Sequence, residues 1–232
     1  MPPMPPATAR VAVPLSVLAF LVAGCGGDPG AARSTPTPLA NVSASPLPSA
    51  SPSVCAKHVT PPASPGPLVG PRANLPAGAP VGGSYTNMSV VVPGVLTRAG
   101  TPDDAGFTWF KTHGWKSVVD VRTTDDNTYA GFVAQKFTYL WLPVNGSSAP
   151  TPDQARSFLC FAGDVANQPV LVHDNSGAER VSVFVSLYRY AAQGWPMNVA
   201  VNEQHLYGDS LTLEQLTFLQ AWANQYPPGT VP

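Results

Sequence analysis

Charged side chains are scarce in this sequence. Lys and Arg number 12 and Asp and Glu 13 among 232 residues, so charged residues make up 11% and the formal net charge is −1. Globular domains typically carry about 25% charged residues. Proteins that bind nucleic acid normally show a clear excess of basic residues. The near-neutral balance therefore predicts no nucleic-acid partner.

Motifs for a metal, a cofactor or a serine nucleophile are also lacking. His58, His113 and His205 do not form an H-x-x-x-H pair with a third ligand, so no metal site is predicted. No G-x-S-x-G sequence marks a serine hydrolase. We expect a protein that works without a metal ion or cofactor.

Proline, in contrast, is abundant and unevenly placed. The chain has 28 prolines, and 19 of them lie in the first 94 residues. Proline normally makes up about 5% of a sequence. The composition divides the chain into a leader rich in Pro, Ala and Ser and a later part of about 140 residues, which is enough for one core.

The first 25 residues have the pattern of an export signal. Arg10 is the only charged side chain before the apolar run 11–22, which is too short for a membrane span of about 20 residues. The sequence L-V-A-G-C at 21–25 resembles a bacterial lipobox. This resemblance implies a lipoprotein signal peptide at 1–24 and a lipid on Cys25. The protein would then be exported and anchored on the outer side of the bacterial cytoplasmic membrane or in the cell envelope. An uncleaved anchor, or a plain signal with a chance cysteine, are the alternatives.

Residues 25–83 are predicted to form a disordered tether. They contain S-T-P-T-P, S-A-S-P-L-P-S-A-S-P-S and P-P-A-S-P-G-P, with few residues able to build a core. With Cys25 lipidated, Cys55 and Cys160 remain, and an oxidising exterior would allow them to pair. One buried Cys160 and one exposed Cys55 is the alternative.

From about residue 88 onward, strand-like and helix-like segments alternate. Strands are predicted at 88–96 with a break at Pro93-Gly94, and at 116–121, 137–144 and 169–173. Helices are predicted to begin at Thr101-Pro102 and Thr151-Pro152, and to cover 180–193, 197–206 and 212–225. This alternation predicts an α/β domain, residues 84–228, with a mostly parallel central sheet flanked by helices.

The loop after strand 169–173 is the best candidate site. Asp174 follows the strand, Asn175, Ser176, Gly177 and Ala178 form the turn, and Glu179 and Arg180 open a helix. Ligands of α/β sheets bind at such strand ends. Loop N–H groups at a helix start, together with a guanidinium, suit a tetrahedral oxyanion. The loop therefore predicts a phosphate-binding cradle.

The same residues carry a family resemblance. H-D-N-S-G-A-E-R at 173–180 resembles the H-C-x-x-G-x-x-R signature loop of cysteine-dependent protein tyrosine and dual-specificity phosphatases. P-G-V-L-T-R-A-G-T-P at 93–102 resembles the entry strand of bacterial and Siw14-like members. The segments 113–122, 142–145 and 187–195 also resemble that family. The resemblance covers roughly residues 90–210, and it implies that His173 is a structural hydrogen-bond partner of the loop.

This sequence departs from the family at the chemical centre. Asp174 replaces the cysteine that attacks phosphorus, and Val181 replaces the hydroxyl residue that assists the leaving thiolate. The usual general-acid position falls near Asn145-Gly146, which has no carboxyl group. Glu179 occupies the place where some bacterial relatives carry an acid, although a solvated first-turn acid is the simpler interpretation. Asp174 would add a negative charge worth about 4 kcal/mol against a bound dianion at ~4 Å.

Other polar residues receive structural interpretations. Arg98 and Arg122 could add anion contacts, but surface salt bridges are the favoured prediction. Asp120 is expected to be a structural acid at a strand end, and Asp125-Asp126 a solvated turn.

Three functions remain open from the sequence. The favoured one is a lipid-anchored pseudophosphatase, which at most binds a phosphorylated or anionic ligand. The second is an active phosphatase that uses Asp174 through an aspartyl-phosphate, with Glu179 as acid and Arg180 holding the phosphoryl group. The third is an envelope protein that binds a protein partner through another surface.

Overall fold

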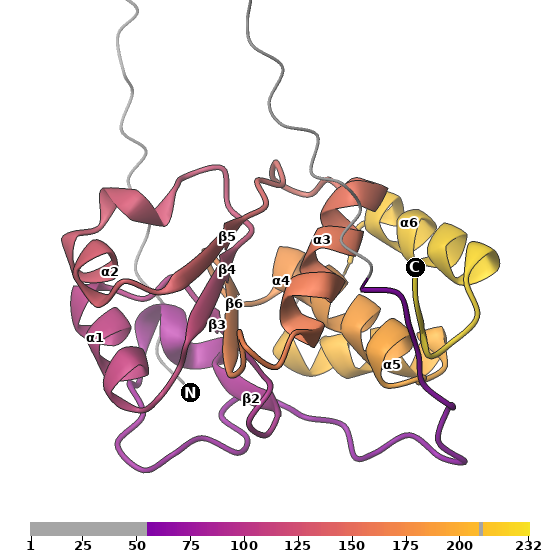
Figure 1. Cartoon of the computed structure of the whole chain (residues 1–232), viewed down its shortest axis with the longest axis horizontal. Coiled ribbons are helices and arrows are strands. Elements are labelled where there is room, and N and C mark those ends of the chain that lie inside the picture. Colours follow the sequence, from indigo (N-terminus) through magenta and orange to yellow (C-terminus); the bar gives the residue numbers. More distant parts are fainter. Residues whose placement is uncertain (1–54, 209–210) are drawn as a thin grey trace, which may run out of the picture. The chain divides into compact units, whose positions relative to one another are not determined.

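The structure is a computed structural model that describes residues 55–208 and 211–232 (Figure 1). The predicted signal peptide, the lipid site Cys25 and the predicted tether up to residue 54 lie outside the described residues. Within the described part, no helix combines the length and the hydropathy that a membrane crossing requires.

A five-stranded sheet in the order β2-β3-β6-β4-β5 forms the centre of the domain. Only β2 and β3 pair antiparallel, and the other neighbours are parallel. The predicted α/β fold with a mostly parallel sheet is confirmed. The strands are β2 (Ser89–Val92), β3 (Leu96–Gly100), β4 (Ser117–Asp120), β5 (Thr138–Trp141) and β6 (Val170–Asp174).

Helices cover both faces of this sheet, which explains why β4 and β6 are apolar on both sides. Figure 1 shows α1 and α2 on one face of the sheet, and the α3–α6 helices on the other. The first face carries α1 (Asp104–Thr112) and α2 (Ala130–Gln135). The second carries α3 (Pro152–Gly163), α4 (Glu179–Leu187), α5 (Met197–Gln204) and α6 (Leu213–Gln225).

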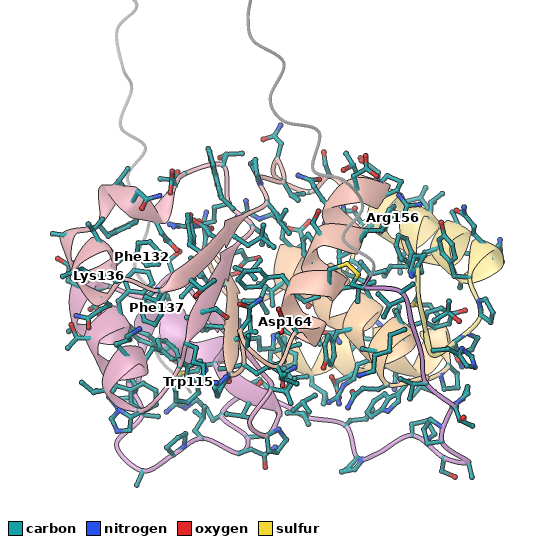
Figure 2. The ribbon with its side chains drawn as sticks, viewed as in Figure 1. Trp115, Phe132, Lys136, Phe137, Arg156 and Asp164 are labelled. Atoms are coloured by element: carbon teal, nitrogen blue, oxygen red, sulfur yellow. A yellow bond between two sulfur atoms is a disulfide. The ribbon has the colours of Figure 1, made fainter. Side chains whose placement is uncertain are left out.

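Two apolar cores separate these layers. The core under α1 and α2 is aromatic, and Trp115, Phe132 and Phe137 lie there with Phe107 and Phe110 (Figure 2). The core under α3, α4 and α6 is built mainly from aliphatic side chains and Phe158 and Phe184. The sheet is therefore fixed from both sides, and its strand ends hold the loops above them in place.

Helix starts follow the local sequence closely. Thr151 caps α3 and Thr212 caps α6, each in a reciprocal capping box. At α1 the prediction was wrong by two residues: the capping side chain is Asp103, which accepts from the N–H of Gly106, and not Thr101. The short helix α2 was missed, because its N-cap residue Tyr129 makes no side-chain capping hydrogen bond and is not a typical capping residue.

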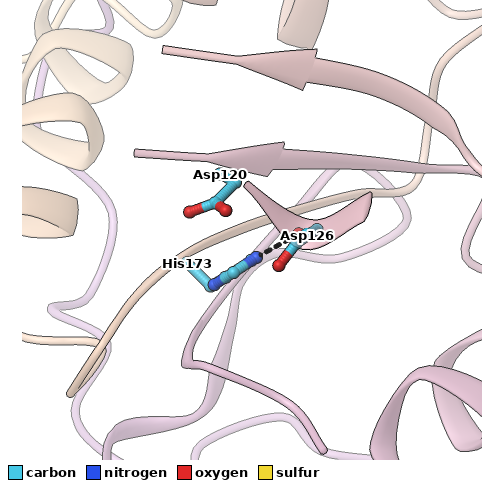
Figure 3. A group of neighbouring side chains, drawn as sticks. All are labelled: Asp120, Asp126 and His173. Carbon is cyan, nitrogen blue, oxygen red and sulfur yellow. Dashed lines mark hydrogen bonds and ion pairs between the residues drawn. The ribbon is translucent and has the colours of Figure 1, made fainter. Parts of the chain in front are cut away.

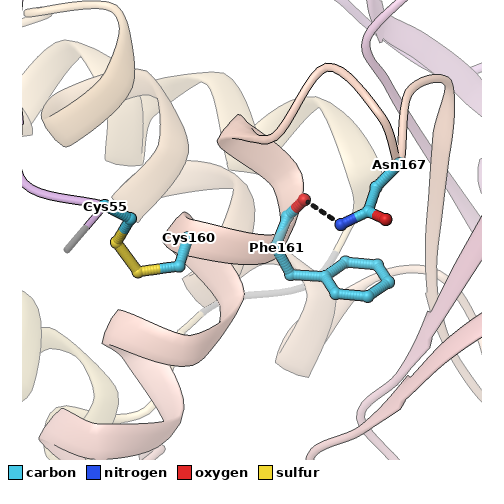
Figure 4. Close-up of a disulfide and its surroundings, with 4 residues drawn as sticks. All are labelled: Cys55, Cys160, Phe161 and Asn167. Carbon is cyan, nitrogen blue, oxygen red and sulfur yellow. Dashed lines mark hydrogen bonds between the residues drawn. A yellow bond between two sulfur atoms is a disulfide. The ribbon is translucent and has the colours of Figure 1, made fainter. Parts of the chain in front are cut away.

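Residues 55–83 correct the predicted tether, because they pack against the domain. β1 (Lys57–His58) pairs antiparallel with β7 (Thr230–Val231). Cys55 is joined to Cys160 of α3 by a disulfide with 5.4 Å between the Cα atoms (Figure 4). Of the two interpretations left open for these cysteines, the structure has the pairing. Distant partners hold this segment, which composition alone does not reveal. We call residues 55–70 the strap.

Candidate functional site

The candidate site is the turn between β6 and α4, which we call the signature loop, residues 174–180. Asp174 is the last residue of β6, and Glu179 is the first residue of α4. Gly177 has φ +73°, and a Cβ there would lie 2.5 Å from the Ala99 carbonyl carbon. Only glycine fits this close approach to β3. The loop is thus pressed onto the sheet at the strand ends, where ligands of parallel sheets bind.

The carboxylate of Asp174 occupies the inside of this loop. Oδ1 accepts from the N–H groups of Ser176 at 2.9 Å and Gly177 at 2.5 Å. Oδ2 accepts from the N–H groups of Arg180 at 3.1 Å and Val181 at 3.3 Å. The side chain is 2% exposed. An oxyanion is therefore already in the cradle, and it belongs to the chain itself.

The side chain of Arg180 borders this carboxylate. Its Nε lies 3.8 Å from Asp174 Oδ2, and its Nη1 donates to the carbonyl of Val144 at 3.2 Å. The side chain is 12% exposed. Arg180 is therefore a cation of the signature loop that solvent can reach.

Arg98 overturns the prediction of a surface salt bridge. This β3 side chain is fully buried behind the signature loop, and its guanidinium donates to the carbonyls of Gly177 and Ala178. It also donates to Ser182 Oγ at 2.9 Å and to Gln204 Oε1. Arg98 therefore supports the loop from behind and does not line its mouth.

A second buried ionic group lies beside the loop at the ends of β4 and β6. We call Asp120, Arg122, Asp126 and His173 the strand-end cluster. Arg122 donates to both oxygens of Asp120, at 2.9 and 2.8 Å, and to Asp126 Oδ1 at 2.5 Å. Asp126 is fully buried, so the predicted solvated turn is wrong for this residue. Arg122 is likewise a buried structural cation and not a surface residue.

The resemblance implied that His173 is a hydrogen-bond partner of the signature loop, and this expectation is wrong for its side chain. Its Nε2 lies 2.8 Å from Asp126 Oδ2, and Figure 3 marks this contact with a dashed line. Its buried Nδ1 has no hydrogen-bond partner among the described residues. Burial raises the pKa of the Asp120 carboxyl, and the hydrogen bond from Arg122 opposes this effect. The cluster ties the strand before the signature loop to the turn after β4.

The strand-end cluster is the group of described residues whose ligand atoms could surround a metal ion. One atom each from Asp120, Asp126 and His173 lie within 4.8 Å of one another. However, the Arg122 guanidinium already donates to both carboxylates. A cation would have to displace it, so the donor set fits an ion pair better than a metal.

The positions considered for a general acid and for a leaving-group hydroxyl make few contacts that would support such a role. Glu179 is half-buried, and its Oε1 accepts a 3.4 Å contact from Gln215 Nε2. Val181 is buried and provides no hydroxyl to the loop. Asn145 and Gly146 form a turn in which the Asn145 carbonyl accepts from Ser148 N–H. Of the positions considered for a general acid, Glu179 is the one that carries a carboxyl group.

Comparison with protein families identifies the fold. The family described as PTP-NADK, a DSP-PTPase phosphatase fused to NAD+ kinase, matches residues 84–221. The chain belongs to this family. The predicted relation to tyrosine and dual-specificity phosphatases is thereby confirmed.

Individual relatives agree with this assignment. The probable NAD kinase 2, chloroplastic, of Oryza sativa subsp. japonica is 30% identical over 135 residues, which are 52% of this chain and 13% of that protein. The tyrosine-protein phosphatase-like protein OCA2 of Saccharomyces cerevisiae is 27% identical, over 54% of this chain and 68% of that protein. The chain thus spans only about an eighth of the plant protein's length. The crystal structure of P. aeruginosa TpbA has a TM-score of 0.51 at 22% identity and covers 58% of this chain and 83% of that one, which shows a shared fold.

Proposed function

We propose that this domain is a pseudophosphatase, in which the phosphatase fold is retained and catalytic turnover is lost. The observation that carries the proposal is the Asp174 carboxylate, which accepts four N–H groups of its own signature loop. These backbone donors are the groups that would hold a phosphoryl oxygen. A ligand would have to compete with a covalently attached anion.

The chemistry of Asp174 supports the same proposal. A carboxylate is a weaker nucleophile toward phosphorus than a thiolate, and both oxygens of Asp174 are engaged in hydrogen bonds. Val181 gives no hydroxyl to assist a leaving group. Loss of covalent catalysis removes several kcal/mol of barrier lowering, because each factor of ten in rate corresponds to about 1.4 kcal/mol. We therefore propose that any remaining role is the binding of a phosphorylated or anionic ligand beside Arg180.

We also propose that the protein is exported and carries a lipid on Cys25. The lipobox-like sequence at 21–25 motivates this, and the Cys55–Cys160 disulfide fits an oxidising compartment. The mature protein should fractionate with membranes and become soluble when Cys25→Ser is introduced. A mature N-terminus that mass spectrometry finds unmodified, at a residue other than Cys25, would refute the anchor.

The decisive experiment for turnover compares four proteins on p-nitrophenyl phosphate. Wild type should hydrolyse it no faster than Arg180→Ala, which lacks the cation of the loop. Asp174→Cys with Val181→Thr should gain measurable activity, because a cysteine at a helix N-terminus beside an arginine has a lowered pKa. Asp174→Asn is the matched control that keeps the volume and removes the charge. Wild-type turnover that Asp174→Asn abolishes would instead indicate an aspartate nucleophile and overturn the proposal.

A further inference from the structure

Arg98 is a buried cation without a carboxylate partner in the part of the chain that the structure describes. Its Nε and Nη2 donate to the Gly177 carbonyl, at 3.0 and 2.6 Å. Nη2 also donates to the Ala178 carbonyl and to Ser182 Oγ, and Nη1 donates to Gln204 Oε1. All of these acceptors are neutral oxygens. The guanidinium is thus well solvated by dipoles, but no adjacent anion balances its charge.

The charge itself is retained at neutral pH. Burial lowers the pKa of Arg98 to about 10, which leaves the group protonated. The ring of Tyr207 covers it, with 3.5 Å between Arg98 Cζ and the ring centroid. A buried cation that lacks a counterion is strongly destabilising. A compensating negative charge is therefore needed nearby.

Two buried carboxylates, Asp174 and Glu203, act electrostatically on Arg98, and Glu203 is already paired with Arg189. The signature loop lies between Arg98 and the remaining one, Asp174. In a planar trans peptide, the carbonyl and the N–H point in opposite directions. Because the Gly177 and Ala178 carbonyls face Arg98, the N–H groups of the same peptide units point away from it. Those N–H groups belong to Ala178 and Glu179, in the middle of the turn. Asp174 accepts from the N–H groups on either side of them, such as those of Gly177 and Arg180. Arg98 thus fixes the orientation of the middle of the loop, between the two sets of N–H groups that hold Asp174.

We propose that Arg98 is a positioning residue and the second cation of the anion site, with Asp174 as its internal counterion across the signature loop. This inference rests on the proposed pseudophosphatase function, and it adds a residue outside the signature loop to the site. Arg98 and Arg180 together provide two positive charges for one carboxylate. When the charge of Asp174 is removed, the site suits a dianionic tetrahedral oxyanion such as inorganic phosphate.

A double-mutant cycle tests the charge balance without any ligand. Gln204 already accepts from Arg98, so Gln204→Glu places a carboxylate directly beside the guanidinium with almost no change of shape. Asp174→Asn should lower the folding equilibrium constant of the full chain at least about ten-fold more in wild type than in Gln204→Glu. Denaturant unfolding with the disulfide intact measures both values.

Arg72 offers a matched control for this cycle. It is another arginine that donates to backbone carbonyls, those of Ala79, Pro80 and Tyr85, but it does not support the signature loop. In the Arg72→Lys background, Asp174→Asn should cost as much as in wild type. Equal costs of Asp174→Asn in the wild-type and Gln204→Glu backgrounds would overturn the proposal.

Phosphate titration provides the second readout. Asp174→Ala should bind inorganic phosphate at least about ten-fold more tightly than wild type, and adding Gln204→Glu should remove this gain. Adding Arg72→Lys should leave it unchanged. Phosphate affinity that Gln204→Glu leaves unchanged would overturn the role of Arg98. Failure of the proposed function appears separately, as wild-type turnover of p-nitrophenyl phosphate, while the folding cycle needs neither ligand nor turnover.

Discussion

Two buried ionic groups lie side by side at the strand ends, and they are built differently. In the strand-end cluster, the Arg122 side chain donates directly to the carboxylates of Asp120 and Asp126. In the signature loop, Asp174 accepts mainly from backbone N–H groups, and its contact with Arg180 is 3.8 Å long. One group is a closed set of side-chain ion pairs, and the other is an anion held by a loop.

This difference separates acids held by side-chain ion pairs from an acid held by the backbone of a loop. Asp120 and Asp126 both pair with Arg122, so their charges are compensated within the cluster. Asp174 uses donors that belong to the backbone and that any oxyanion of suitable size could use instead. Four substitutions or conditions should distinguish the two groups.

The largest effect is expected for Arg122→Met. It leaves the carboxylates of Asp120 and Asp126 buried without their cation, which should lower the free energy of unfolding by about 3–5 kcal/mol. Chemical denaturation measures this loss. Arg156→Met is the control, because Arg156 pairs with Asp153 at a side-chain exposure of 36% and 94%. The control should cost no more than about 1 kcal/mol. Similar losses in both variants would mean that the cluster is not a closed ion-pair group.

A smaller loss is expected for Asp174→Asn. The amide keeps one acceptor oxygen but turns an NH₂ group toward the N–H groups of Arg180 and Val181, which should cost about 1–3 kcal/mol. In Asp174→Ala, where no side-chain carboxylate fills the loop, added phosphate should restore part of the lost stability. In Arg122→Met, phosphate should restore none of it. Thermal unfolding with and without phosphate measures the difference. If phosphate stabilised Arg122→Met and not Asp174→Ala, the anion site would lie in the strand-end cluster, and the prediction would be wrong.

The pH dependence of the Arg122→Met penalty should be a still smaller effect. Burial raises the pKa of Asp120, so the folded state holds this proton more tightly than the unfolded state. Such a group favours folding below its unfolded pKa and loses that contribution as pH rises through the folded pKa. Arg122 opposes the rise, so its loss raises the pKa further. The stability gap between wild type and Arg122→Met should shrink by about 1 kcal/mol from neutral pH to about pH 4. A gap that widens on acidification would contradict this sign.

The smallest effect is expected for Glu179→Gln. Its single side-chain contact, 3.4 Å to Gln215, is at the long limit of a hydrogen bond. The substitution should change the free energy of unfolding by about 0.5 kcal/mol or less, and it should not alter phosphate binding by Asp174→Ala. Denaturant unfolding of Glu179→Gln measures the first quantity, and calorimetric titration of phosphate into the variant that combines Glu179→Gln with Asp174→Ala measures the second. A strong loss of binding would bring Glu179 into the anion site.

The local signals in the sequence predicted most of the fold. Threonine caps fixed the starts of α3 and α6, and the valine runs fixed β4 and β6, since these features act within a few residues. Residues 55–83 were mispredicted because their ordering depends on partners far along the chain, such as Cys160. Composition indicates how much apolar surface a segment can bury by itself, but it does not show which distant residues the segment can bond to.

The turn between β6 and α4 was predicted from the sequence, and the side chains that support it were missed. The order His, Asp, Gly and Arg at 173–180 identified the signature loop, because this chemistry is contiguous in sequence. Arg98 and Asp126 were assigned to the surface, since arginine and aspartate are seldom fully buried. Their partners Gln204 and His173 come from distant elements. Only the threonine-capped and valine-rich elements around them could be predicted from neighbouring residues.

The disulfide also determines where tension enters the domain. A pull on the chain before Cys55 would pass through the sulfur–sulfur bond into α3, because Cys160 lies in that helix. The strap beyond Cys55, with its two-residue pairing of β1 with β7, would then carry no load. Reduction would redirect the force to that pairing, which could be peeled apart one residue at a time. The oxidised domain would therefore transmit the force directly to α3, and the reduced domain would begin to unfold at the pairing of β1 with β7.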